Sequence, residues 1–316
     1  MLSRTAQCLY WMSRHMERAE LNARLLEVGY RIALMPSTSS GYQSEWASVL
    51  SVAGAEKGYA RKYGPPKQQF IEQYLFHDLD NPSSIASCIH HARENARIVR
   101  TALTTQVWDV INTVYQEVQS LAQKKYLPAN LPTICDWTTR QASLLRGAIE
   151  STQLEDDGYD FLNLGYFIER ADNTARLLDV KYYVLLPTPS AVGGEVDHYQ
   201  WSTLLRAMSA YRAFRWAYPR LQTPDKVAHF LILNVACPKS LLHCLSRASR
   251  HLDQLETVLG QRTEAQDLVT QLKNSLENRT IDNIFDEGLH EFLNHFTGQI
   301  ASLGETIRNS YFLGGF

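Results

Sequence analysis

Two stretches of the chain repeat each other, and each carries a glutamate–arginine pair in the middle of a helical pattern. YWMSRHMERAELNARLLEV (10–28) and LNLGYFIERADNTARLLDV (162–180) share eight identities over nineteen positions, at an offset of 152 residues. The charged pairs are among the identities: Glu17, Arg18, Glu169 and Arg170. A fixed internal offset is typical of a duplicated structural unit. The fold must therefore place two similar helices, each with opposite charges at its centre.

Two weaker matches extend this relation along the chain. EWASVL, which begins at residue 45, matches QWSTLL at an offset of 155, and NPSSIASCI, which begins at residue 81, matches CPKSLLHCL at an offset of 156. The offset drifts by only four residues, as small loop insertions would produce. We predict a tandem duplication, with a first repeat over residues 1–154 and a second over residues 155–316.

The apolar spacing predicts an all-α fold. Apolar residues recur every three or four positions between prolines, and no sustained alternation of period two is present. Because the first helix of each repeat has apolar residues on two faces, both should be central, in one continuous core with the two units packed as a pseudo-two-fold helical bundle. The predicted helices are 3–34, 43–63, 67–77, 82–104, 106–125, 132–152, 158–186, 197–217, 224–234, 238–259, 262–277 and 281–312.

The four central charges should be partly buried and should neutralise each other. Adjacent residues on a helix point about 100° apart, so the glutamate and arginine of one pair cannot bind each other well. A buried charge without a partner is costly. We predict that the two helices meet near a pseudo-two-fold axis, with Glu17 facing Arg170 and Arg18 facing Glu169.

Two interpretations of these residues stay open at this point. In the first, which we favour, they are structural ion pairs that fix helix register. In the second, they line a cleft for a peptide-like or carboxylate ligand, which arginine would bind bidentately. Secondary candidates for the same site are one residue of the first helix and three of HHARENARIVR: Arg14, Arg93, Glu94 and Asn95. For the three in HHARENARIVR we favour the alternative that they form a solvated helix face.

Other polar and aromatic groups carry weaker signals. Glu20–Arg24 and Asp172–Arg176 have the i,i+4 spacing of ordinary exposed ion pairs. The acidic turn FHDLDNP has no acidic counterpart in LILNVACP, so a helix start is favoured there and no metal site is predicted. We expect the tryptophans to lie in the core: Trp11, Trp46, Trp108, Trp137, Trp201 and Trp216.

Composition excludes several classes of protein. The formal net charge is -2, without the basic excess of a nucleic-acid-binding protein. The five cysteines are scattered and form no CxxC pair, which indicates a reducing compartment. The first residues lack the pattern of a signal peptide, and no apolar run approaches the roughly 20 residues of a membrane helix. We expect a cytoplasmic chain that binds neither nucleic acid nor membrane.

The chain resembles the bacterial alpha-E family, an all-helical domain named for its ER motif and typically found as a tandem duplication. The stretches that carry the resemblance are LSRTAQCLYWMSRHMERAELNARLLEV, YDFLNLGYFIERADNTARLLDV and NPSSIASCIHHARENARIVRTALTTQVWDVIN. The motif residues that it implies are Glu17, Arg18, Glu169 and Arg170. The second repeat diverges after residue 230, where NVACPKS replaces DLDNPSS, so any site built there would be one-sided.

The resemblance implies a context rather than an activity. Proteins of this family are similar in context to components of a peptide-synthesis or modification system that contains circularly permuted ATP-grasp amide ligases, transglutaminase-like proteins and an N-terminal-nucleophile-type peptidase. No ATP-binding, nucleophile, metal or cofactor motif is visible in this sequence. We therefore expect a non-catalytic accessory or scaffold subunit without a cofactor. The alternative is an enzyme or ligand-binding protein that uses the Glu/Arg-lined cleft for a peptide-like or carboxylate substrate.

Overall fold

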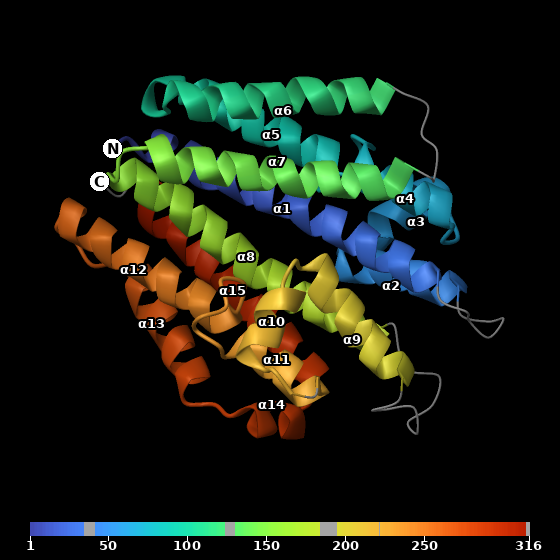
Figure 1. Ribbon diagram of the computed structural model, residues 1–316. Coiled ribbons are helices and arrows are strands. Elements are labelled where there is room, and N and C mark those ends of the chain that lie inside the picture. Colours follow the sequence, from blue (N-terminus) through green and yellow to red (C-terminus); the bar gives the residue numbers. More distant parts are fainter. Residues whose placement is uncertain (35–41, 124–129, 184–194, 221, 314–316) are drawn as a thin grey trace.

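The described residues, which are 1–34, 42–123, 130–183, 195–220 and 222–313, form helices and connecting turns without a β-strand in the computed structural model (Figure 1). The all-α prediction is thereby confirmed. The elements are α1 (Ser3–Ala33), α2 (Tyr42–Val52), α3 (Glu56–Tyr63), α4 (Gln68–Phe76), α5 (Ile85–Ile98), the 3-10 turn η1 (Arg100–Ala102), α6 (Thr105–Gln123), α7 (Leu131–Thr152), α8 (Asp157–Tyr183), α9 (Glu195–Ala207), α10 (Tyr211–Ala217), α11 (Pro224–Ile232), α12 (Leu241–Leu259), α13 (Glu264–Glu277), α14 (Ile281–Glu287) and α15 (Leu289–Tyr311).

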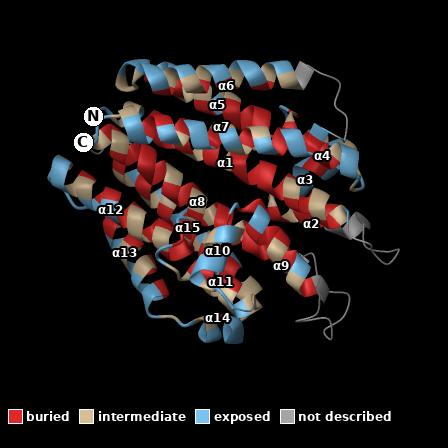
Figure 2. Ribbon diagram, viewed as in Figure 1, coloured by how far each residue is buried: buried red, intermediate tan, exposed pale blue. Residues whose placement is uncertain are grey.

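The two longest helices, α1 and α8, lie side by side at the centre and run in the same direction (Figure 1). On one side α5 and α7 pack against α1 and carry α6, while on the other side α12 and α15 pack against α8 and carry α13. Buried residues are concentrated along α1 and α8, and the outer helices expose their far faces (Figure 2). The apolar side chains of both halves form one continuous core. The short helices also follow in a similar order in each half, but the duplication itself stays a prediction.

One glycine lets α1 and α8 approach closely. A Cβ atom at Gly165 would lie 2.2 Å from the backbone oxygen of Tyr10, a distance that real Cβ atoms do not adopt. The two backbones therefore touch one helical turn before Glu169 on α8 and two turns before Glu17 on α1, which sets how the side chains beyond this point meet.

Several predicted helices are divided by residues in the left-handed region of backbone conformation. The predicted helix 43–63 breaks at Gly54 (φ 65°), 197–217 breaks at Ser209 (φ 54°), and 281–312 breaks at Gly288 (φ 99°). A positive φ is compatible with glycine but unusual for serine, and it ends a right-handed helix. The predicted ends at 125 and 186 lie outside the described residues.

Two other predicted helices begin three residues late, because a serine caps each of them. Ser84 accepts a hydrogen bond from the backbone N–H of Ser87 (3.1 Å), and Ser240 accepts one from that of His243 (3.0 Å). A serine cap satisfies a backbone donor that the first helical turn leaves free. Pro82 and Pro238, at which the predicted ranges begin, lie in the preceding turns.

The tryptophan prediction is only partly right. Trp46 and Trp201 are buried, whereas Trp216 on α10 is 80% exposed. No helix of the described residues has an apolar stretch long enough to cross a membrane.

Candidate functional site

The two charged pairs bind each other across the contact between α1 and α8. Arg18 donates to the Glu169 carboxylate from Nε (2.6 Å to Oε1) and from Nη2 (3.1 Å to Oε2). Arg170 donates to the Glu17 carboxylate from Nε (3.0 Å to Oε2) and from Nη2 (2.9 Å to Oε1). Both predicted cross-pairs are therefore confirmed, and both are bidentate, which is the strongest geometry for arginine and a carboxylate.

The carboxylates are more deeply buried than the sequence indicated. Glu17 is 5% exposed and Glu169 only 1%, while the arginine side chains reach outward to partly exposed positions. Removing a charge from water costs several kcal/mol, so each carboxylate depends on the hydrogen bonds that replace its hydration. The four residues act as a reciprocal connection between the two central helices.

The Glu169 end of this connection holds a second arginine. Arg14 Nε lies 2.7 Å from Glu169 Oε2, and Arg14 Nη1 donates to the Tyr10 hydroxyl (3.1 Å). The Arg14 guanidinium also lies 4.8 Å from the ring centre of Trp11. Burial opposes ionisation of Glu169, but Arg14 and Arg18 outweigh it and lower its pKa to about 2. This carboxylate is fully ionised near neutral pH.

The Glu17 end has a single bidentate arginine. Arg170 lies over the ring of Tyr166, 4.1 Å from its centre, and Asn173 donates to the backbone oxygen of Glu17 (2.9 Å). Burial raises the pKa of Glu17 to about 7, in spite of Arg170, and the neighbouring Glu20 carboxylate adds to the increase. The pKa values of the two carboxylates are therefore shifted in opposite directions although their motifs are the same.

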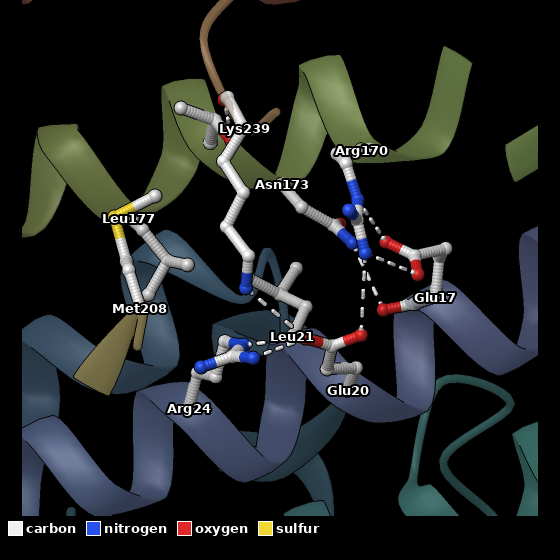
Figure 3. A pocket seen from close by; sticks show the side chains of 10 residues that line it. Glu17, Glu20, Leu21, Arg24, Arg170, Asn173, Leu177, Met208 and Lys239 are labelled. Carbon is white, nitrogen blue, oxygen red and sulfur yellow. Dashed lines mark hydrogen bonds and ion pairs between the residues drawn. The ribbon is translucent and has the colours of Figure 1, made fainter. Parts of the chain in front are cut away.

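A small cavity adjoins Glu17 (Figure 3). The cavity is large enough for a single water molecule, whose centre could move within about 20 Å³. Its walls come from α1, α8 and two turns of the second half: Glu17, Glu20, Leu21, Arg24, Arg170, Asn173, Thr174, Leu177, Met208 and Lys239.

Glu20 and Arg24 form a buried ion pair in this wall, so the prediction that they are exposed was wrong. Arg24 also donates to the backbone oxygen of Ala207 at the end of α9. Lys239, from the turn before α12, places its Nζ 3.4 Å from Glu20 Oε1. Burial lowers the pKa of Lys239 to about 8. Sequence reasoning missed Lys239, for which the only signal is a lysine at the position where the first half has Ser83.

A similar arrangement holds the other i,i+4 pair. Arg176 binds Asp172 (2.6 Å) and donates to the backbone oxygen of Val52 at the end of α2 (3.2 Å). Arg24 and Arg176 thus each tie a central helix to a short helix of the opposite half.

The secondary candidates divide between two places. Arg14 joins the central ion pairs, but Arg93, Glu94 and Asn95 do not. Arg93 binds Glu94 (2.6 Å) and lies over the ring of Tyr115 on α6, and Asn95 donates to the backbone oxygen of His91. These three stabilise the packing of α5 and its outer surface.

The acidic turn before α5 is occupied by its own partners. Lys62 binds Asp78 and Asp80 at 2.7 Å each, and Tyr63 donates to Asp78 (2.8 Å). Within the described ranges, no three His, Cys, Asp or Glu side chains lie close enough together to hold a metal ion.

A larger cavity lies on the other side of Arg24. It has a volume of about 440 Å³ and is formed by the second half of α1, the start of α7 and the α9–α10 turn. Its walls include several arginines and acids: Arg24, Glu27, Arg31, Asp136 and Arg206. Its size is within the range of small-molecule sites.

A comparison with known protein families matches residues 1–312 to Alpha-E, described as a predicted alpha-helical domain with a conserved ER motif. The chain belongs to the Alpha-E family. Searches of curated proteins and of solved structures each gave no match. In this Alpha-E protein, the ER pairs at 17–18 and 169–170 bind each other between the two central helices.

Proposed function

We propose that this Alpha-E protein is a non-catalytic helical scaffold or accessory subunit of a bacterial, cytoplasmic peptide-synthesis or modification system. Its proposed partners are a circularly permuted ATP-grasp amide ligase and a transglutaminase-like protein. It would hold a partner or its peptide substrate in place, without a cofactor of its own.

One observation carries this proposal. Each motif carboxylate is already bound by an arginine from the opposite helix, and the space beside them holds about one water molecule. A catalytic acid or an anion clamp must reach the substrate at hydrogen-bond distance. The motif residues are instead satisfied by each other, which suits a structural role.

The test is a reconstituted ligation assay with the ATP-grasp partner, with and without this chain. We expect that the partner binds the chain and that ligation depends on its presence. Glu17→Gln and Arg170→Ala should lower the free energy of unfolding but leave ligation unchanged below their unfolding temperatures. Arg140→Ala, which removes an exposed ion pair with Asp136 on α7, is the matched control.

A second candidate function is binding of a small carboxylate or peptide-like ligand, with or without chemistry. It is favoured by one observation: Arg24 lines both the water-sized cavity and the cavity of about 440 Å³. If Glu17→Gln stays folded and yet abolishes ligation, while its partner still binds, the scaffold proposal is wrong and this second candidate replaces it.

A further inference from the structure

The outward face of α10 combines an exposed tryptophan with exposed arginines. Arg212, Arg215 and Trp216 are spaced at i, i+3 and i+4, so they share one side of the helix, opposite the buried Phe214. Trp216 is 80% exposed. A large aromatic side chain in water, flanked by arginines, has the composition of a binding hot spot.

Two further exposed arginines flank α10 in the chain, Arg206 in the last turn of α9 and Arg220 just after α10. We call the set of five residues the α10 face: Arg206, Arg212, Arg215, Trp216 and Arg220. Arg206 lies over the ring of Tyr211 (4.3 Å to its centre), and Arg215 donates to the backbone oxygen of Arg220 (3.4 Å). Within the described part of the chain, none of these four arginines forms an ion pair with a carboxylate. The α10 face therefore carries positive charge that is not neutralised locally.

The matching region of the first half lacks this property. There α3 is also basic, but three acids accompany it: Glu56 on the helix itself, and Asp78 and Asp80, which bind Lys62. In the second half, the positions that correspond to these three acids, at offsets of 155 and 156, all carry uncharged residues: Tyr211, Asn234 and Ala236. Trp216 likewise stands at the position of Arg61. The second half lacks acids at these positions and has a tryptophan in place of Arg61.

We propose that the α10 face is the surface through which this chain docks an acidic protein partner, with Trp216 entering an apolar recess between the carboxylates of that partner. This inference rests on the scaffold function and names the chemistry of its partner. Charge complementarity selects the occupant, because unpaired arginines gain most from carboxylates that also desolvate them. The net charge of -2 and the confinement of the arginines to one short segment favour an acidic protein over a nucleic acid or an anionic membrane.

The first experiment uses the full chain and defined probes. The probes are a fluorescent peptide in which glutamate pairs alternate with leucine, the same peptide with glutamine for glutamate, a short single-stranded DNA, and vesicles that contain phosphatidylglycerol. We expect the chain to bind the acidic peptide and none of the other three probes. Arg212→Glu with Arg215→Glu should weaken it by about tenfold or more, and Trp216→Ala by a similar factor.

The matched control carries the same change of charge on the other half, Lys57→Glu with Arg61→Glu on α3, and should bind as wild type does. Equal losses in both double variants, no binding of the acidic peptide, or preference for DNA or vesicles would overturn the proposal. If the wild-type chain forms a dimer and the α10 variants do not, the proposal is wrong, and the partner of the α10 face is a second copy of this chain.

A second measurement separates this inference from the scaffold function. The ATP-grasp partner is titrated with wild type and with the α10 double variant. We expect tight binding of wild type and a loss of about tenfold or more for the variant. If wild type and the α10 double variant bind the partner equally well, the proposed role of the α10 face is wrong, but the scaffold function stands. If wild type binds no such partner while peptide binding still depends on the α10 face, the scaffold function fails and the acidic-surface specificity remains.

Discussion

Glu17 and Glu169 belong to the same motif and make the same bidentate contact, yet their surroundings give them opposite properties. Glu169 is held by two arginines, and its pKa is lowered to about 2. Glu17 has one bidentate arginine and a water-sized cavity beside it, and its pKa is raised to about 7. A repeated motif therefore fixes which groups meet, but the residues around it decide in which direction the pKa of each carboxylate is shifted.

The difference has an identifiable source. Arg14, the second arginine on Glu169, corresponds at the offset of 152 to Tyr166. Tyr166 has no positive charge to offer a carboxylate, and it lies beneath Arg170 instead. Likewise, Lys239 near Glu20 corresponds to Ser83. Of these two differences, the missing second arginine agrees with the raised pKa of Glu17, whereas Lys239 acts in the opposite direction and lowers it.

The largest expected effect is on stability when Glu169 is neutralised. Glu169→Gln leaves Arg14 and Arg18, which are only partly exposed, without a counter-charge and should lower the free energy of unfolding by about 4 kcal/mol. Glu17→Gln should cost about half as much near pH 7, because the neutral form of Glu17 is already populated there. Urea denaturation of both variants measures this difference; equal losses would contradict the asymmetry between the two ends.

A smaller effect is expected when the Glu169 end is made to resemble the Glu17 end. Arg14→Gln removes one of two arginines from Glu169 and should lower the free energy of unfolding by about 2 kcal/mol. It should also raise the pKa of Glu169, which carboxyl-carbon NMR can follow. Arg4→Gln, on the same helix and without a carboxylate partner in the described residues, is the control. An unchanged pKa would show that Arg18 alone keeps Glu169 charged.

Ionisation of Glu17 should lower the free energy of unfolding by about 1 kcal/mol between pH 6 and pH 8. Its pKa is raised in the folded state, so its contribution is complete at low pH and is lost as the pH rises through about 7. From pH 6 to pH 8 the advantage of wild type over Glu17→Gln should therefore shrink by about 1 kcal/mol. The difference between the two proteins is the quantity to compare, because burial lowers the pKa of His15 and of Lys239 as well. A constant difference would mean that Glu17 is ionised throughout this range.

The smallest effect is expected for Lys239→Met. The lysine is mostly buried and its Nζ is 3.4 Å from a carboxylate that Arg24 already binds, so its removal should change the free energy of unfolding by less than about 1 kcal/mol. The same urea denaturation at pH 7 measures it. A loss of several kcal/mol would show that Glu20 depends on Lys239 rather than on Arg24.

The central contact could be predicted from the sequence because its physics is local and repeated. The helical spacing placed Glu17 and Arg18 where neither could bind the other, and the second copy offered the complementary groups. The burial of Glu20 and Arg24 could not be predicted in this way. Their partners are the backbone oxygen of Ala207 and Lys239, more than 180 residues away, and i,i+4 spacing says nothing about such contacts.

The helix breaks and the exposed tryptophan show a second limit. Ser209 adopts a positive φ that serine seldom takes, and Trp216 stands in water although its residue type favours burial. Both depend on tertiary surroundings that outweigh the preference of the residue. Arg93, Glu94 and Asn95 were grouped with the site only because polar residues cluster there, and the packing of α5 turned them towards α6 and the surface.

The reciprocal pairing of α1 with α8 has a consequence for biosynthesis. When the ribosome has released only the first 150 residues or so, Glu17, Arg14 and Arg18 have no counterparts, and the nascent helix must keep them hydrated. The amino-terminal part can complete its core only once the segment around Glu169 and Arg170 has emerged. We therefore expect the two halves to complete their folding together, after the segment around Glu169 and Arg170 has been synthesised, rather than one after the other.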